Sequence, residues 1–192
     1  METPKIYDFD PRNLPYDLLA AIGLMTTSAA QTEGIIEMAI AGCAGIDAEY
    51  GMAVTTHMTS PLRDSVLRSV AEIRIDDLDA LDELDKLLDA INDALIKRNA
   101  VVHHTWCRDT KTGKTFTVKE TARTRLESEL LPMSVDQVKR DALFVYEAGI
   151  NLLTFLIRHK LTPKAMTFRP RGHKSKAARK KRREIMLSRG GA

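Results

Sequence analysis

The clearest pattern in the chain is a stripe of apolar residues at intervals of three and four positions between residues 77 and 102. This spacing places side chains on one face of an α-helix, so a helix is predicted over these residues. Acidic residues crowd its first half, whereas Lys97 and Arg98 lie near its end. Both placements suit the helix dipole. The stripe consists of Leu78, Leu81, Leu84, Leu88, Ile91 and Leu95.

The part of the chain before this stripe predicts two more helices. Residues 16–46 are rich in Ala, Leu, Ile and Met and contain no proline, so we expect one long helix there. Residues 47–59 have no such pattern and are expected to be irregular. Ser60-Pro61 then combines an N-cap with a proline at the first helical position, which predicts a helix over residues 61–73.

A last helix is predicted over residues 134–159. It opens with Ser134 and Gln137, a capping box in which the two side chains satisfy each other's free backbone N–H groups. Pro163 prevents the helix from continuing. The side chains expected to face the core are Leu143, Ala148, Leu152, Phe155 and Leu156.

Residues 104–120 have a different character. Thr105-Trp106-Cys107 and Thr115–Val118 favour β-strand, and the segment between them, 109–114, is rich in turn-forming residues. A short β-hairpin is predicted. The expected fold is therefore all-α, a four-helix up-down bundle of antiparallel helices with a short β-hairpin insertion before the last helix.

Charge divides the chain into two segments. Residues 163–192 contain eleven Lys and Arg and one acid, whereas the preceding residues contain 18 basic and 25 acidic residues. We therefore expect a helical domain over residues 1–162, with a formal charge of about −7, and a basic tail over 163–192, of about +10. The tail has few large apolar residues and is predicted to be disordered.

Composition also indicates the cellular compartment in which the protein is expected. The chain has two cysteines, Cys43 and Cys107, far apart in sequence, which favours a reducing compartment over a disulfide framework. The first residues lack the apolar run of a signal peptide, and no apolar stretch is long enough to cross a bilayer. We expect a cytoplasmic protein with no membrane partner.

One group of residues is suggestive of chemistry. Continued past Leu95, the apolar stripe reaches Arg98, where a guanidinium needs an anion or another polar partner. Asn99 and His103 lie beside it, one helical turn apart, so that their side chains can touch. RNA cleavage needs an acid, a base and a cation for the phosphate, which His and Arg can supply. Neither a metal nor another cofactor is required.

The run from Arg98 to His103, Arg-Asn-Ala-Val-Val-His, resembles the signature of the HEPN family (higher eukaryotes and prokaryotes nucleotide-binding). In that family an Arg is followed by a polar residue, three variable residues and a His, late in a bundle helix. By order of elements, the resemblance covers about residues 15–160. It implies a homodimer whose two motifs face each other. For active members it also implies metal-independent endoribonuclease activity, often in toxin–antitoxin or antiviral systems.

Carried over to this chain, the resemblance makes Arg98 the phosphate-binding cation, Asn99 the polar support and His103 the acid or base. Some members are inactive and serve as binding modules. The alternative for this chain is a structural cluster, with Arg98 paired to an acid on another helix while Asn99 and His103 cap the helix end. His104 follows directly, so either histidine is a candidate to face the site.

The basic tail is a second candidate for function. We expect it to bind RNA or DNA through phosphate contacts. An acidic protein partner such as an antitoxin and a purely solubilising role are the alternatives. A zinc site near His103-His104 is not expected, because one cysteine lies nearby and no second ligand pair follows. The nucleic-acid-binding candidates are Arg179, Lys180, Lys181, Arg182 and Arg183.

Overall fold

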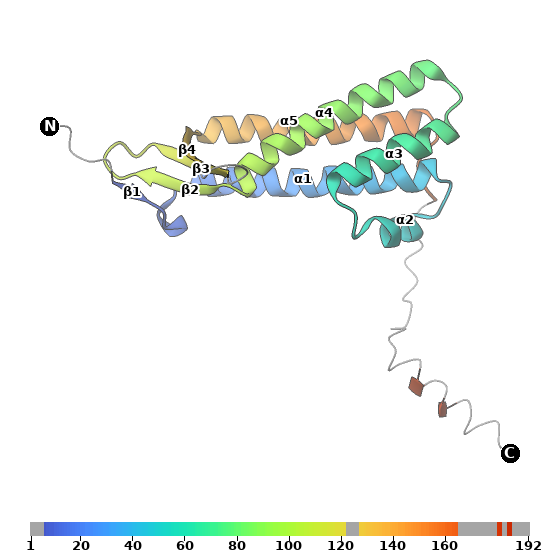
Figure 1. Ribbon diagram of the computed structural model, residues 1–192, viewed down its shortest axis with the longest axis horizontal. Helices are drawn as coiled ribbons and strands as arrows, with labels where there is room; N and C mark the ends of the chain where they lie inside the picture. The colour runs from blue at the N-terminus through green and yellow to red at the C-terminus, as the bar shows by residue number, and fades with distance from the viewer. Residues whose placement is uncertain (1–5, 122–126, 165–179, 182–183, 186–192) are drawn as a thin grey trace.

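The computed structural model describes residues 6–121, 127–164, 180–181 and 184–185. Between residues 6 and 164 it contains five α-helices, with an antiparallel sheet inserted before the last of them (Figure 1). The helices are α1 Tyr16–Cys43, α2 Ala48–Thr55, α3 Ser60–Arg74, α4 Leu78–Val102 and α5 Val135–Arg158. The strands are β1 Tyr7–Asp8, β2 Thr105–Asp109, β3 Thr115–Thr121 and β4 Glu127–Pro132.

Helices α1 and α5 lie side by side and run in the same direction (Figure 1). Thr32, in the middle of α1, donates a hydrogen bond of 2.9 Å to the carbonyl of Val145. At the C-terminal ends, a Cβ added to Gly42 would overlap the carbonyl oxygen of Leu161. A Cβ added to Gly149 of α5 would likewise lie 2.5 Å from Oγ1 of Thr32, so a glycine at each contact allows the close approach. This parallel pair differs from the predicted up-down order. Helix α3 runs in the same direction as α1, and α4 then returns the chain to the end at which α1 begins (Figure 1).

Helix α2 is the fifth helix, and it lies in the segment expected to be irregular. Gly51 lies in its interior, where glycine weakens an isolated helix. In the fold Gly51 packs directly on Ala41 of α1, and an added Cβ would lie 2.5 Å from the Cβ of Ala41. The contact with α1 explains both the helix and the need for glycine, and neither is visible in the local pattern.

The predicted hairpin is confirmed as strands β2 and β3, and it is part of a larger sheet of order β1-β2-β3-β4. Asp109 stabilises the turn by accepting hydrogen bonds from the backbone N–H groups of Lys111, at 2.8 Å, and Thr112, at 3.1 Å. Gly113 follows with φ of +72°. Strand β4 was not predicted, because its residues are largely exposed and show no alternation of apolar and polar positions.

The helix interiors follow the predicted stripes except at particular positions. Leu84, Leu88, Ile91 and Leu95 of α4 are buried, whereas Leu78 is 75% exposed at its start. In α5, Leu143 was expected to face the core but is 53% exposed. Ser134 caps α5 as predicted, by accepting from the Gln137 N–H at 3.2 Å. The Gln137 side chain donates instead to Asp141, so the reciprocal half of the capping box is replaced.

The remaining predictions about segments concern the membrane and the tail. Among the described residues, no helix is both long and apolar enough to span a membrane. The predicted disorder of residues 165–179, 182–183 and 186–192 lies outside the described part of the chain. The described tail residues 180–181 and 184–185 are helical.

Candidate functional site

The C-terminal end of α4 presents the three residues of the predicted motif. His103 is the C-cap residue, and its backbone N–H donates to the carbonyl of Asn99 at 3.0 Å. The helix ends there against the sheet, because the indole N–H of Trp106 in β2 donates to the carbonyl of Val101 at 2.8 Å. This hydrogen bond satisfies a carbonyl in the last turn of α4 and fixes the helix end relative to β2.

The structure brings Arg98, Asn99 and His103 into direct contact. Nη1 of Arg98 donates to Oδ1 of Asn99 at 3.0 Å and lies 3.1 Å from Nε2 of His103. A guanidinium has only donors, so Nε2 has to accept in this contact, and the neutral imidazole then carries its proton on Nδ1. Asn99 and His103 are exposed, and the side chain of Arg98 retains 20% exposure. Solvent therefore reaches the site.

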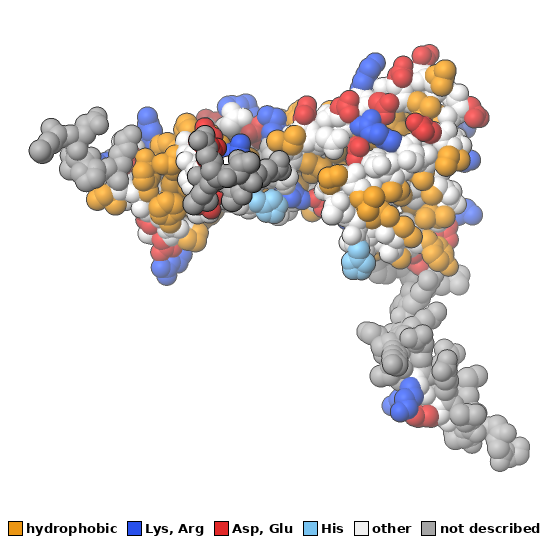
Figure 2. Space-filling model, viewed as in Figure 1, with side chains coloured by type: hydrophobic (Ala, Val, Ile, Leu, Met, Phe, Trp, Pro, Cys, Tyr) orange, Lys and Arg blue, Asp and Glu red, His pale blue; other side chains and the backbone are white. Residues whose placement is uncertain are grey.

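Of the two neighbouring histidines, His103 is the one that meets Arg98. His104 is partly buried, and its Nδ1 atom has no hydrogen-bond partner within the described part of the chain. The contact with Arg98 therefore favours His103 over His104 as the histidine of the candidate site, and its role there stays a prediction. In Figure 2, histidine side chains are visible between the sheet and the α2–α3 region, and again at the lower edge of the α2–α3 region.

Sequence reasoning missed the acidic partner of the site. Nη2 of Arg98 donates to Oε1 of Glu33 in α1, and the two side chains are 20% and 27% exposed. A signal was present in the sequence, because Glu33 and Glu37 are the only charged residues between Leu18 and Ile46. Two acids one turn apart on an otherwise uncharged helix indicate cationic partners on neighbouring elements.

A second arginine, Arg63 of α3, lies on the other side of these two acids. Its Nη2 atom is 3.1 Å from Oε1 of Glu37, and its Nη1 atom is 3.8 Å from Oε2 of Glu33. Sequence analysis did not single out Arg63. The approach of α3 to α1 brings it to the site, and nothing in the pattern around position 63 marks that approach.

Neither cysteine adds chemistry here. Both thiols are buried and free, and burial raises the pKa of Cys43 to about 11 and the pKa of Cys107 above its ordinary value. Both are therefore thiols near neutral pH, the form that is a poor nucleophile and metal ligand. The described residues include no group of three or more His, Cys, Asp or Glu placed to hold a metal ion.

Most residues of the predicted nucleic-acid-binding site in the tail lie outside the described part of the chain. Arg179, Arg182 and Arg183 are outside the described residues, while Lys180 and Lys181 are described and exposed. Nζ of Lys180 lies 4.0 Å from Oε1 of Glu184, one turn away. An exposed pair of this kind contributes little to stability. The two lysines remain available to an anionic partner.

The arrangement at α4 has definite chemical capacities. The guanidinium of Arg98 keeps donors beyond those directed at Asn99, His103 and Glu33, so it can also hold a phosphate oxygen. The imidazole of His103 is a side chain of the kind that serves as acid or base in catalysis. A hollow of about 610 Å³ lies elsewhere, near Pro15, Lys114 and Val135, and its lining does not include Arg98, Asn99 or His103.

Comparisons with protein-family models, with curated protein sequences and with solved structures give no match for this chain.

Proposed function

We propose that the chain is a metal-independent endoribonuclease of the HEPN type. The observation that carries this proposal is the contact of 3.1 Å between Nη1 of Arg98 and Nε2 of His103 at a solvent-accessible helix end. A cation and a titratable group within one hydrogen bond of each other match the needs of phosphodiester cleavage. The resemblance of residues 98–103 to the HEPN signature supports the same assignment.

The proposed reaction uses the ribose 2′-hydroxyl as the nucleophile. Arg98 occupies the lone pair on Nε2 of His103 in the structure, so the substrate phosphate first has to draw the guanidinium away from Nε2. Nε2 then takes the hydroxyl proton as the 2′-oxygen attacks phosphorus, and the bond from phosphorus to the 5′-oxygen breaks. Arg98 stabilises the charge that develops on the phosphate oxygens, and Asn99 holds Arg98 in place. A proton has to reach the leaving 5′-oxygen. The products are a 2′,3′-cyclic phosphate and a 5′-hydroxyl, so atoms and charge balance without a metal or redox partner.

We further propose a homodimer, because the reaction needs both a base and an acid. The described contacts place one imidazole, that of His103, against Arg98. A second copy with its motif facing the first would bring a second imidazole to the same phosphate. The basic tail would add RNA affinity through phosphate contacts, which suits a chain whose remaining residues are net acidic. A toxin or defence role, with an acidic antitoxin as partner, is the biological setting that the resemblance implies.

One observation favours a second function, that of a catalytically silent HEPN-like module binding nucleotide, RNA or a partner protein. The guanidinium of Arg98 is already occupied by Glu33 and Asn99. An arginine held in this way also serves to tie α4 to α1. In that function Arg98 and His103 maintain the helix end, and truncating them affects stability or binding but no reaction.

An assay of RNA cleavage in the presence of EDTA separates the two functions. The purified full chain is expected to cleave mixed RNAs with EDTA present. The 3′ ends of the RNA fragments should resist phosphatase until mild acid opens the 2′,3′-cyclic phosphate. Arg98→Ala is expected to lose about 10²–10³-fold in rate, as on removal of a charge-stabilising donor. Arg140→Ala is the control. Arg140 lies on α5, where its side chain donates a hydrogen bond to Gln137, so the variant should cleave RNA at the wild-type rate.

Two results would contradict the nuclease proposal. A folded wild-type chain that leaves all of the RNAs intact would favour the silent module. Cleavage that persists at full rate in Arg98→Ala would assign the activity to another site or to a contaminant.

A further inference from the structure

Behind Arg98 the structure places a row of charged groups that alternate in sign. Glu33 and Glu37 lie one turn apart on α1, where like charges repel each other. Arg63 lies against both carboxylates, and Arg98 lies against Glu33 alone. The order Glu37, Arg63, Glu33, Arg98 therefore joins α3, α1 and α4. Without Arg63 the two acids would face one guanidinium, and one negative charge would be left uncompensated.

Arg63 is itself held firmly. Its side chain is 12% exposed, and Nε and Nη2 both approach the carbonyl oxygen of Thr55, at 3.4 and 3.3 Å. Thr55 ends α2, and the carbonyls at a helix C-terminus carry partial negative charge. A guanidinium with anionic or carbonyl partners on several sides has little freedom to move. Arg63 is thus a fixed cation on which the orientation of its neighbours can depend.

The connection to the candidate site runs through the two oxygens of one carboxylate. Oε1 of Glu33 accepts from Nη2 of Arg98, whereas Oε2 of Glu33 faces Nη1 of Arg63. A guanidinium is planar and rigid, so fixing Nη2 also fixes the direction of Nη1. In Arg98 it is Nη1 that contacts Asn99 and His103. The position of Glu33 therefore determines whether this contact forms.

We propose that Arg63 is a positioning residue of the Arg98–His103 site. It acts through Glu33 to orient the guanidinium of Arg98, and so sets the contact with Nε2 of His103. The described polar contacts of the Arg63 side chain are with Glu33, Glu37 and Thr55, none of which belongs to the predicted motif. Its effect on the imidazole follows from geometry alone, while its consequence for RNA cleavage rests on the proposed function.

The tautomer of His103 reports this effect without any substrate. A neutral imidazole in water prefers its proton on Nε2, whereas acceptance from Arg98 requires the proton on Nδ1. The ¹⁵N chemical shifts of the ring, measured on the full chain at a pH where its imidazoles are neutral, give the ratio of the two forms. The wild-type chain is expected to be mainly in the Nδ1–H form. In Arg63→Met the ratio should move about tenfold toward Nε2–H, the effect of losing one charge-assisted hydrogen bond.

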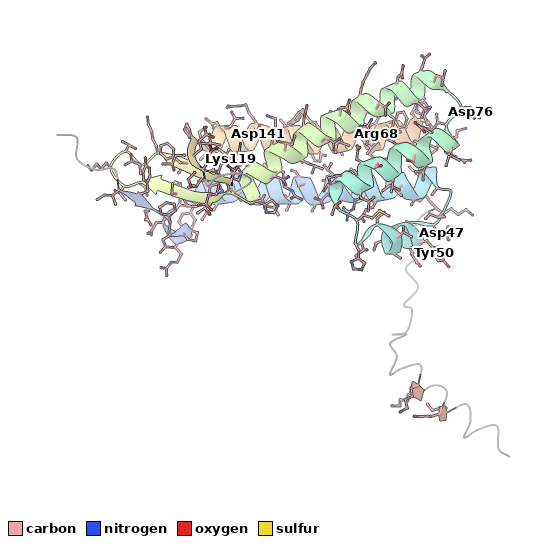
Figure 3. All side chains as sticks on the ribbon, viewed as in Figure 1. Asp47, Tyr50, Arg68, Asp76, Lys119 and Asp141 are labelled. Atoms are coloured by element: carbon pink, nitrogen blue, oxygen red, sulfur yellow. The ribbon has the colours of Figure 1, made fainter. Side chains whose placement is uncertain are left out.

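Arg68→Met is the matched control. Arg68, labelled in Figure 3, lies on the same helix. Its ion pairs reach Asp64, Asp85 and Asp89 and tie α3 to α4. These carboxylates hold the pKa of the Arg68 guanidinium above its usual range. The substitution therefore disturbs α3 strongly but leaves Glu33 in place, and the His103 ratio should stay at its wild-type value. Arg63→Lys, which keeps the charge between the two acids, should restore most of the wild-type ratio.

The proposal is overturned if folded Arg63→Met keeps the wild-type ratio, or if Arg68→Met shifts it equally. It is also overturned if the wild-type ring is already mainly Nε2–H. If Arg63→Met does not fold, Arg63→Gln takes its place with the same outcomes. In the RNA assay, Arg63→Met should lower kcat more than it changes KM. Absence of cleavage in the wild type would remove the proposed function and leave the tautomer result intact, so the two failures are distinguishable.

Discussion

Replacing His103 by alanine is expected to lower the rate of RNA cleavage by about 10²–10⁴-fold, the contribution of a positioned general acid or base. The reason is local, because Nε2 of His103 is the titratable atom in contact with Arg98. Among the residues that the structure describes, no other titratable side chain contacts Nη1 of Arg98. Asn99, the other side chain that contacts Nη1 of Arg98, carries an amide that does not titrate near neutral pH.

His104→Ala is the control for this prediction, since it removes the adjacent imidazole from the same helix end. His104 is partly buried and is not the ring that contacts Arg98, so its loss should leave most of the activity. Circular dichroism and the oligomeric state should match the wild type for both variants. Equal losses in the two variants, or a loss confined to His104→Ala, would show that the geometry assigns the wrong histidine.

The largest effect on stability is expected from Phe155→Ala in α5. Phe155 is 1% exposed and is among the largest fully buried side chains, and its ring lies 4.4 Å from that of His159. Truncation leaves a cavity in the helical core and should lower the free energy of unfolding by about 3–5 kcal/mol. Urea unfolding followed by circular dichroism, at one fixed protein concentration, measures this change.

Ile157→Ala is the matched control for this cavity. Ile157 lies two residues further along α5 and is 61% exposed, so its truncation should change the unfolding free energy by no more than about 0.5 kcal/mol. A similar loss in both variants would mean that the face of α5 carrying Ile157 is covered. A small loss in Phe155→Ala would contradict the burial of the core itself.

Local pattern was sufficient for the elements that position the site. The stripe of α4, the Ser134 cap of α5 and the turn at Asp109 each depend on neighbours within a few residues. The meeting of Arg98, Asn99 and His103 was predictable for the same reason, since all three lie within the last turns of one helix.

What escaped prediction depends on contacts between distant segments. Helix α2 forms despite Gly51 because that glycine packs against Ala41 of α1. The largely exposed strand β4 forms by pairing with β3. Glu33 and Arg63 join the site only because α1, α3 and α4 pack together there. The parallel arrangement of α1 and α5 likewise depends on α3 running in the same direction as α1, because α4 then returns the chain to the start of α1 (Figure 1). None of these neighbours is specified by spacing along the sequence.

A double-mutant cycle on RNA cleavage tests most directly whether Arg98 and His103 form one catalytic site. The rates of the wild type, Arg98→Ala, His103→Ala and the double variant are compared under the same conditions. Residues that act as a unit have non-additive effects, so the double variant should be no slower than the slower single variant. A double variant whose loss equals the product of the two single losses would show that the residues act independently, which would contradict a shared site.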